Sequence, residues 1–151
     1  MSEYRVTVSW RRQSAGFTYE EYNREHTWSF DAGIQVRASA APAFRGKLDC
    51  VDPEEAFVAA LSSCHMLTFL AIASRKRLVV DSYEDDAVGY MEKNAEGKLA
   101  VTRVILRPRI KFSGPEAPTG DQLAKLHEHS HHECFIANSV LTEVTVEPAE
   151  A

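Results

Sequence analysis

Two cysteines are the residues of this chain best suited to chemistry. Cys64 lies in the apolar stretch 59–70, and Cys134 follows seventy residues later, directly after Glu133. A single buried thiol is usually inert. Two thiols that meet in the fold can form and break a disulfide. The pair therefore predicts a redox site if the fold brings Cys64 and Cys134 together.

A reactive Cys64 would need particular neighbours. It lies near the middle of a predicted helix, where the helix dipole does little to favour a thiolate, and apolar surroundings disfavour the charged form. A nearby cation would offset this, and arginine suits best because it stays charged when buried. A buried arginine in turn needs a carboxylate. From composition alone, a small inert core residue is an equally good interpretation of Cys64.

The elements that position these thiols follow from the apolar pattern. Alternation of apolar and polar residues predicts strands at 4–11, 26–30 and 34–37. A polar, aromatic-rich connection at 13–23 joins the first two strands, and residues 38–51 are expected to be irregular. The first third of the chain is thus predicted to form a small sheet.

A long helix is predicted to carry Cys64. Asp52 suits the N-cap, Pro53 suits the first helical position, and Glu55 can close a capping box. The pattern predicts that the helix runs to about residues 75–77. Its middle is apolar on all sides, which predicts a fully buried helix.

The second half of the chain predicts a hairpin, a helix and a closing strand. The ranges are strands at 79–91 and 99–112 around a turn at 94–97, a helix from Thr119 to Cys134, and a strand at 140–146. This element order predicts an α+β fold with a mainly antiparallel sheet. We expect a single domain over residues 1–151.

Composition narrows the classes of function. The net charge of −5 argues against nucleic acid or an anionic membrane as the main partner. The residues after Met1 lack the layout of a signal peptide, and no apolar run is expected to reach the roughly 18–20 residues that span a bilayer. We therefore expect a cytoplasmic protein. There a lasting disulfide is not expected but a transient one is.

Two motifs together resemble a known family. They are Asp52-Pro53-Glu54-Glu55, with Cys64 ten residues after Glu54, and His131-His132-Glu133-Cys134-Phe135-Ile136-Ala137-Asn138-Ser139. Over nearly its whole length the chain closely resembles the OsmC/Ohr family, in its OsmC-like branch. The resemblance implies antiparallel sheets wrapped around buried central helices in an intertwined homodimer. It also implies a thiol-dependent peroxidase that reduces organic hydroperoxides.

The resemblance assigns roles to four residues. Cys64 corresponds to the peroxidatic cysteine, Cys134 to the resolving cysteine and Glu54 to the acidic residue. The family's arginine lies in the connection between its first strands, where Arg24 matches best. The alternatives for this arginine are Arg12 and Arg45. The resemblance implies no bound cofactor, and it implies an external dithiol reductant, often a dihydrolipoyl group.

Helix geometry adds an expectation about assembly. Ten helical residues rise about 15 Å, so Glu54 and Cys64 of one chain lie about three turns apart. One arginine can hardly bridge that span within a single helix. If two copies of the helix pack together, Glu54 of one chain can approach Cys64 of the other. We therefore expect a homodimer with an active site shared between chains.

Other interpretations concern the histidines and the fate of the thiols. His127, His131 and Cys134 fall on one helical face and could bind zinc, although a solvated histidine-rich face is commoner. His65 is expected to be a core histidine rather than a base for Cys64. Cys50 is interpreted as an incidental thiol. A non-catalytic, redox-sensing domain is the remaining alternative.

Overall fold

The structure of the protein is a computed structural model that describes residues 1–149. It contains helices and mainly antiparallel sheets, which confirms the predicted α+β class. The chain divides into two compact units, Met1–Ala56 and Phe57–Ala151. The long helix that carries Cys64 begins in the first unit and continues through the second.

The first unit contains a three-stranded antiparallel sheet in the order β1-β2-β3. Its strands are β1 (Thr7–Ser9), β2 (His26–Ser29) and β3 (Gln35–Ala38). Trp28 is the centre of the register, because it pairs with Val8 on one side and Val36 on the other. The strands lie where alternation predicted them, and β1 is shorter than expected.

Helix α1 (Pro53–Arg75) begins where its sequence predicts. The Asp52 carboxylate accepts a hydrogen bond from the amide of Glu55 at 2.8 Å, and the Glu55 carboxylate accepts one from the amide of Asp52 at 3.2 Å. This reciprocal capping box satisfies two amides that would otherwise lack partners. Beyond the last turn, Arg77 adopts a positive φ of 60° and ends the helical path.

The second unit holds two separate sheets, with a two-stranded β4-β7 sheet and a three-stranded β5-β6-β8 sheet. Their strands are β4 (Val79–Asp85), β5 (Val88–Lys93), β6 (Leu99–Leu106), β7 (Pro108–Ser113) and β8 (Glu143–Val146). Strand β8 pairs with β6 in parallel and the other pairs are antiparallel. The turn at 94–97 is confirmed, with the amide of Asn94 bonded to the carbonyl of Lys98.

The prediction of two long strands at 79–91 and 99–112 was wrong. Each is two strands that belong to different sheets. At the break, the Asp85 carboxylate accepts the amide of Arg107 at 2.6 Å and the hydroxyl of Ser62 at 2.5 Å. At this point the Arg107 amide therefore donates to the side chain of Asp85 rather than to a backbone carbonyl of a neighbouring strand. Apolar alternation continues across the break, so the pattern alone could not reveal it.

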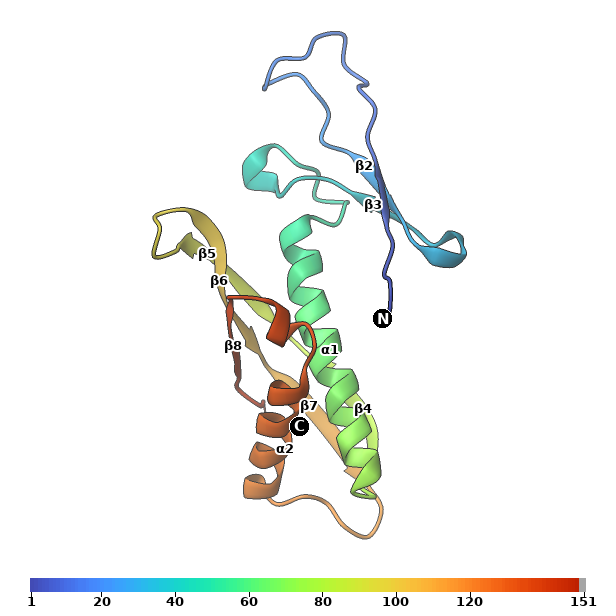
Figure 1. Cartoon of the computed structure of the whole chain (residues 1–151), viewed down its shortest axis with the longest axis vertical. Helices are drawn as coiled ribbons and strands as arrows, with labels where there is room; N and C mark the ends of the chain where they lie inside the picture. Colours follow the sequence, from blue (N-terminus) through green and yellow to red (C-terminus); the bar gives the residue numbers. More distant parts are fainter. Residues whose placement is uncertain (150–151) are drawn as a thin grey trace. The chain divides into compact units, whose positions relative to one another are not determined.

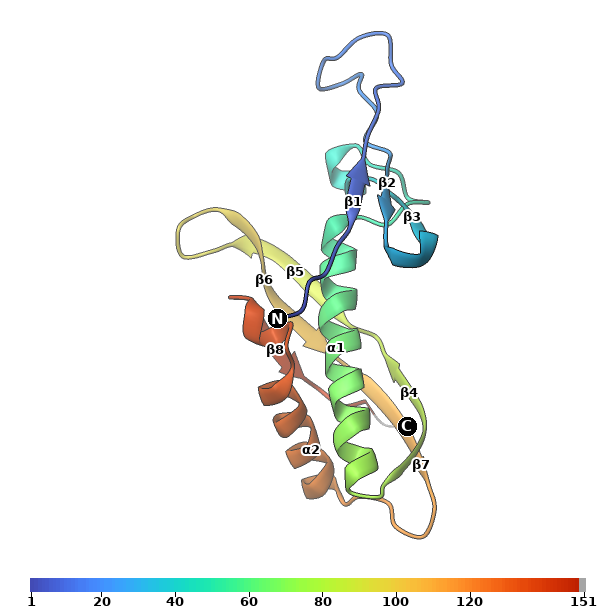
Figure 2. The same ribbon diagram turned by 45° about the vertical axis from the view of Figure 1, so that its right-hand side comes forward.

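Helix α2 (Gly120–Glu133) opens with the predicted capping box between Thr119 and Gln122. In both ribbon views it lies beside the C-terminal half of α1 and runs in the opposite direction (Figures 1 and 2). The N-terminus of α2 therefore lies at the same end of the helix pair as the C-terminus of α1. The remaining helical turns are 3-10 segments at Asp31–Gly33, Pro42–Phe44 and Ala137–Ser139.

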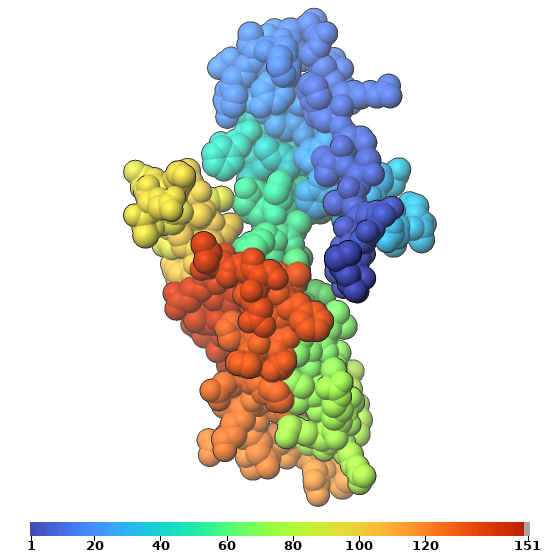
Figure 3. All heavy atoms as spheres, in the orientation of Figure 1, coloured from blue at the N-terminus to red at the C-terminus, as the bar shows by residue number. Residues whose placement is uncertain are grey.

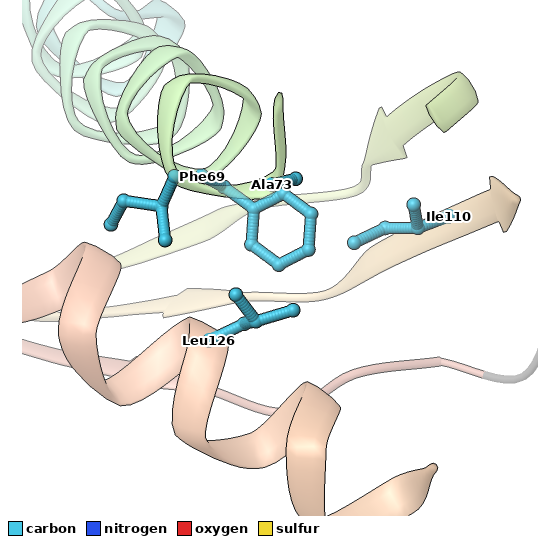
Figure 4. Packing of buried hydrophobic residues seen from close by; sticks show 5 residues of the cluster. Phe69, Ala73, Ile110 and Leu126 are labelled. Atoms are coloured by element: carbon cyan, nitrogen blue, oxygen red, sulfur yellow. The ribbon is translucent and has the colours of Figure 1, made fainter. Parts of the chain in front are cut away.

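Two apolar clusters hold the second unit together. In the first, Phe69 and Ala73 of α1 pack against Ile110 of β7 and Leu126 of α2 (Figure 4). In the second, α1 contributes Leu61 and β6 contributes its buried residues Val104 and Leu106. Helix α1 is therefore the common element of both clusters, and it fixes Cys64 between them.

Only one face of α1 is buried, so the prediction of a fully buried helix was wrong for the single chain. The buried residues are Leu61, His65, Phe69, Ile72 and Ala73. On the opposite face Leu67 is 59% exposed, and atoms of α1 reach the surface in Figure 3. The sequence pattern reports which residues avoid water, and it cannot say whether the covering surface belongs to the same chain.

Helix α1 also corrects the expectation that no apolar segment approaches membrane-spanning length. Among the described residues, α1 is the one helix long and apolar enough to cross a membrane. Core helices of soluble proteins pass the same test, and α1 supplies residues to both apolar clusters. We therefore draw no conclusion about a membrane from its composition.

Candidate functional site

Cys64 opens into a groove along the exposed side of α1. Ala60, Cys64, Leu67 and Ala71 recur at helical spacing, so their side chains share one face of the helix. The groove has a volume of about 560 Å³, and α2 with the residues after it forms its other wall. It is lined by Ala60, Ser63, Cys64, Leu67, Thr68, Ala71, Ile72, Arg75, His129, Glu133 and Phe135.

Cys134 lies behind Cys64 and is only 1% exposed. It caps the C-terminus of α2, and the amide of Ala137 donates to its sulfur at 3.5 Å. Burial raises the pKa of the Cys134 thiol to about 11, and the neighbouring Cys64 thiol acts in the same direction. No disulfide joins the two cysteines in this structure. The structure thus brings together two cysteines that are remote in sequence, one facing a groove and one enclosed.

The groove changes character along its length. Leu67, Ala71 and Phe135 give it apolar walls, whereas Arg75 and His129 are polar. Cys64 and Arg75 are eleven residues apart on α1, which corresponds to about 16 Å along the helix axis. Sites for small organic molecules combine apolar walls with a few polar groups in this way. Sequence analysis assigned no role at this site to Arg75, His129 or Glu133.

Arg24 is a buried cation in the first unit. It is 8% exposed, and its guanidinium donates to the backbone carbonyls of Tyr19 and Tyr22. The same group lies over both tyrosine rings, at 4.7 Å and 3.6 Å from their centroids. Among residues 1–149 no carboxylate forms an ion pair with it. A guanidinium held by carbonyls and aromatic faces keeps its full charge available for an anion.

The connection at 13–23 is folded around these aromatic rings. The ring of Tyr22 packs against Phe17 at 5.3 Å and against Trp10 at 6.3 Å. The indole of Trp10 donates to the carbonyl of Asn23 at 2.7 Å. Arg24 and these aromatic residues line an open pocket of about 410 Å³. The segment predicted as a polar, aromatic-rich connection therefore positions Arg24.

The other predicted site residues of the first unit are less buried than Arg24. Glu54 lies in the first turn of α1 and is half-buried, and no ion pair within the described residues joins it to Arg24. The guanidinium of Arg12 donates to the carbonyls of Ser14 and Ala15. Arg45 is exposed and donates to the carbonyl of Glu20 at 3.4 Å. Of the three candidate arginines, only Arg24 is buried.

The histidines of the two helices form a pair that sequence analysis missed. His65 is 1% exposed, and its Nε2 lies 3.0 Å from Nδ1 of the buried His127. The pKa of each imidazole is lowered to about 4. Burial causes the shift of His127, and burial together with the neighbouring His127 and His131 causes that of His65. His65 is therefore a neutral core histidine, as expected. Its partner lies 62 residues away, so spacing gave no signal for the pair.

The zinc interpretation finds no support in this arrangement. His127 bonds to His65 rather than sharing a ligand sphere with His131 and Cys134. Within residues 1–149, no three His, Cys, Asp or Glu side chains are placed to hold a metal ion together.

The third cysteine lies in the first unit. The Sγ of Cys50 is 4.0 Å from a carboxylate oxygen of Asp49, whose other oxygen pairs with Arg37 at 3.1 Å. Cys50 therefore lies beside an exposed ion pair, whereas Cys64 lies beside the buried thiol of Cys134. Its interpretation as an incidental thiol stays a prediction.

Comparison with known proteins gives the family. The family model described as OsmC-like protein matches residues 46–149, a range that includes Glu54 and both cysteines of the groove. A search of curated protein sequences finds no match.

Solved structures agree with the family model. An OsmC-like protein of unknown function from Vibrio cholerae shares 52% identity, with a TM-score of 0.95 over 99% of this chain and all of that one. An organic hydroperoxide resistance protein from Elizabethkingia anophelis is similar at 16% identity, with a TM-score of 0.69 over 99% of this chain and 97% of that one. The corresponding protein of Bacillus subtilis is similar at 16% identity, with a TM-score of 0.68 over 99% and 98%. The chain belongs to the OsmC-like protein family.

Proposed function

We propose that the protein is a thiol-dependent peroxidase that reduces organic hydroperoxides to alcohols. The observation that carries the proposal is the position of two thiols side by side, with Cys64 facing an apolar groove and Cys134 enclosed behind it. Family membership and the names of structural relatives, which include organic hydroperoxide resistance proteins, support the same reaction class.

In the first step the Cys64 thiolate attacks the outer oxygen of the hydroperoxide. The O–O bond breaks, Cys64 becomes a sulfenic acid, and the alkoxide takes up a proton and leaves as an alcohol. We propose that Arg24 keeps Cys64 ionised and donates to the peroxide oxygen as negative charge develops. Support for this role comes from its buried guanidinium, which has no carboxylate partner among the described residues.

In the second step the Cys134 sulfur attacks the Cys64 sulfenic acid. The S–O bond breaks, a disulfide forms, and the hydroxyl leaves as water with the proton of the Cys134 thiol. An external dithiol then restores both thiols by exchange and is itself oxidised to a disulfide. A dihydrolipoyl group is the proposed reductant. Burial of Cys134 supports this order, because only Cys64 of the two lines the groove.

We further propose that the protein works as a homodimer. Leu67 and Ala71 are exposed on the face of α1 that carries Cys64, and a second copy of the helix would cover them. The proposed dimer brings Glu54 of one chain toward Cys64 of the other, where it would hold the guanidinium of Arg24. None of the ion pairs among residues 1–149 involves Glu54, which is consistent with a partner in another chain.

Peroxide consumption tests the proposal. The reduced protein is mixed with cumene hydroperoxide and dihydrolipoamide, and peroxide loss is followed over many turnovers. We expect turnover by the parent and by Cys50→Ser, and none by Cys64→Ser. Cys134→Ser should complete one turnover and then accumulate sulfinic acid at Cys64. A non-catalytic redox sensor would instead form the disulfide without sustained turnover.

The groove predicts which peroxides are used. Its apolar walls favour bulky organic hydroperoxides over hydrogen peroxide, which gains nothing from apolar contact. We expect kcat/KM for cumene hydroperoxide to exceed that for hydrogen peroxide. Replacing Phe135, an apolar residue of the groove wall outside α1, by Asn should reduce this preference while leaving the reaction with hydrogen peroxide unchanged. An equal loss with both peroxides would count against the groove as the substrate site.

A further inference from the structure

A buried histidine pair joins the two helices that carry the reactive thiols. His65 follows Cys64 on α1, and His127 lies on α2 seven residues before Cys134. Their facing nitrogens are 3.0 Å apart and the two rings lie within 10° of parallel. One hydrogen bond therefore links α1 to α2, at the residue after Cys64 and about two helical turns before Cys134. The proposed reaction leaves this pair without a role.

Stability does not explain the pair. The outer nitrogens, Nδ1 of His65 and Nε2 of His127, are buried and have no hydrogen-bond partner among the described residues. The ring of Phe69 packs against His127 at 4.7 Å, so the surroundings are apolar. Buried polar atoms without partners destabilise a fold, and an apolar pair of the same shape is often neutral or stabilising. What the histidines add is a directional contact that apolar side chains cannot make.

A proton relay does not explain the pair either. A relay needs a hydrogen-bonded group at each end to give and receive the proton, and neither outer nitrogen has a hydrogen-bond partner among residues 1–149. Burial also lowers the pKa of both imidazoles, so neither stores a proton near neutral pH. The remaining property of the pair is geometric, since the hydrogen bond fixes how α1 and α2 lie against each other.

We propose that the hydrogen bond between His65 and His127 is a positioning contact that holds the Cys134 thiol against Cys64 for disulfide closure. The inference rests on the proposed function, in which closure follows oxidation of Cys64. Displacement of reacting atoms by about 1 Å can slow a reaction roughly a hundredfold. A contact that keeps two helices in register can therefore govern closure without touching either sulfur.

The test uses a reaction that needs no peroxide. In a Cys50→Ser background, the reduced protein is treated with 5,5′-dithiobis(2-nitrobenzoate). Attack by Cys64 releases one thionitrobenzoate and leaves a mixed disulfide. Attack by Cys134 on that disulfide releases the second and closes the bond between the two cysteines. The first release measures access to Cys64, and the second measures how well the fold positions Cys134. A failure of the peroxidase proposal would leave this assay interpretable.

Two matched double variants separate the hydrogen bond from the packing. His65→Gln with His127→Asn keeps polar groups near the bonded nitrogens. His65→Met with His127→Leu has a similar shape without them. We expect the amide pair to close at nearly the parent rate. The apolar pair should close roughly ten- to a hundredfold more slowly, with the first release unchanged.

Thermal melting gives a readout that a merely structural role would not reproduce. We expect the apolar pair to melt at or above the parent temperature although it closes slowly. Equal closure rates in the two double variants, or equal slowing of both releases in the apolar pair, would overturn the inference. If the apolar pair does not fold, His65→Gln with His127→Leu takes its place, with the same expected slowing and the same overturning results.

Discussion

At the scale of single residues, the site joins a thiol that is reachable to a thiol that is not. Cys64 lines the groove, whereas Cys134 is 1% exposed and burial raises its pKa to about 11. A protonated, enclosed thiol reacts poorly with outside molecules and well with a neighbour already in contact. The different environments of the two cysteines suit the different tasks that we propose for them.

The arginine assignment gives a prediction at this scale. Replacing Arg24 by Ala should lower kcat/KM for an organic hydroperoxide roughly a hundredfold, the usual effect of removing a donor to developing negative charge. Arg12→Ala and Arg45→Ala are matched controls, because their side chains are exposed and bond only backbone carbonyls. Steady-state kinetics with cumene hydroperoxide measures all three. A larger loss for either control would move the role away from Arg24.

Some site residues could be read from the sequence and others could not. Local motifs indicated Cys64, Cys134 and the capping residue Glu55, because a motif needs only neighbouring residues. The contact between His65 and His127 could not be found in this way. It depends on how α1 and α2 pack, and each histidine alone looks like an ordinary core residue.

At the scale of elements, the buried histidines predict the response of the fold to acid. Their folded pKa of about 4 lies below the ordinary value of 6.5. Between these values the unfolded chain binds protons that the folded chain does not. The free energy of unfolding should therefore fall as pH drops from about 6.5 toward 4. Each histidine contributes up to about 1.4 kcal/mol per pH unit.

Urea unfolding at pH 7 and pH 5 measures this loss of stability. The double variant His65→Met with His127→Leu is the control, and its stability should fall less over the same range because it lacks both titrating groups. Equal losses in the parent and the variant would show that the imidazoles do not carry the effect.

The contact between α1 and β5 gives a second prediction at this scale. A Cβ added to Gly89 would lie 2.6 Å from a methyl carbon of Val58 and 3.3 Å from one of Val101. Gly89→Ala should therefore lower the free energy of unfolding by about 1–3 kcal/mol through overpacking. Gly120→Ala is the matched control, since nothing lies within 4 Å of its added Cβ. Chemical denaturation of both variants decides, and equal stabilities would contradict the close packing.

The elements also show where sequence patterns stop being informative. Capping boxes placed the starts of α1 and α2 correctly, because those bonds are local. Where the long hairpin splits into two sheets, the Asp85 carboxylate accepts the amide of Arg107, a tertiary contact. Periodicity continues through the break, so the number of sheets could be learned only from the fold.

At the scale of the whole molecule, the uncovered face of α1 is the feature that the single chain leaves unexplained. The sequence predicted a helix buried on all sides, and the chain buries one face of it. Leu67, which is 59% exposed, lies beside Cys64 in the groove. A second copy of the chain would bury this face and complete the site, which is why assembly and activity are expected to be linked.

Mixing inactive variants tests the shared site. Cys64→Ser keeps Glu54, and Glu54→Ala keeps Cys64. If one chain supplies Glu54 to the other, a mixed dimer of the two variants contains one complete site. We expect peroxidase activity to reappear after the variants are unfolded together and refolded. Activity no greater than the sum of the separate variants would mean that each chain forms its site alone.

The central claim is that Cys64 and Cys134 form a disulfide as peroxide is consumed. The most direct measurement is mass spectrometry of the reduced protein after one equivalent of cumene hydroperoxide, with peptides separated without reduction. We predict a peptide linked through Cys64 and Cys134, accompanied by loss of two thiols and formation of one cumyl alcohol. Recovery of both cysteines as free thiols with the peroxide intact, or oxidation of Cys64 that never links to Cys134, would contradict it.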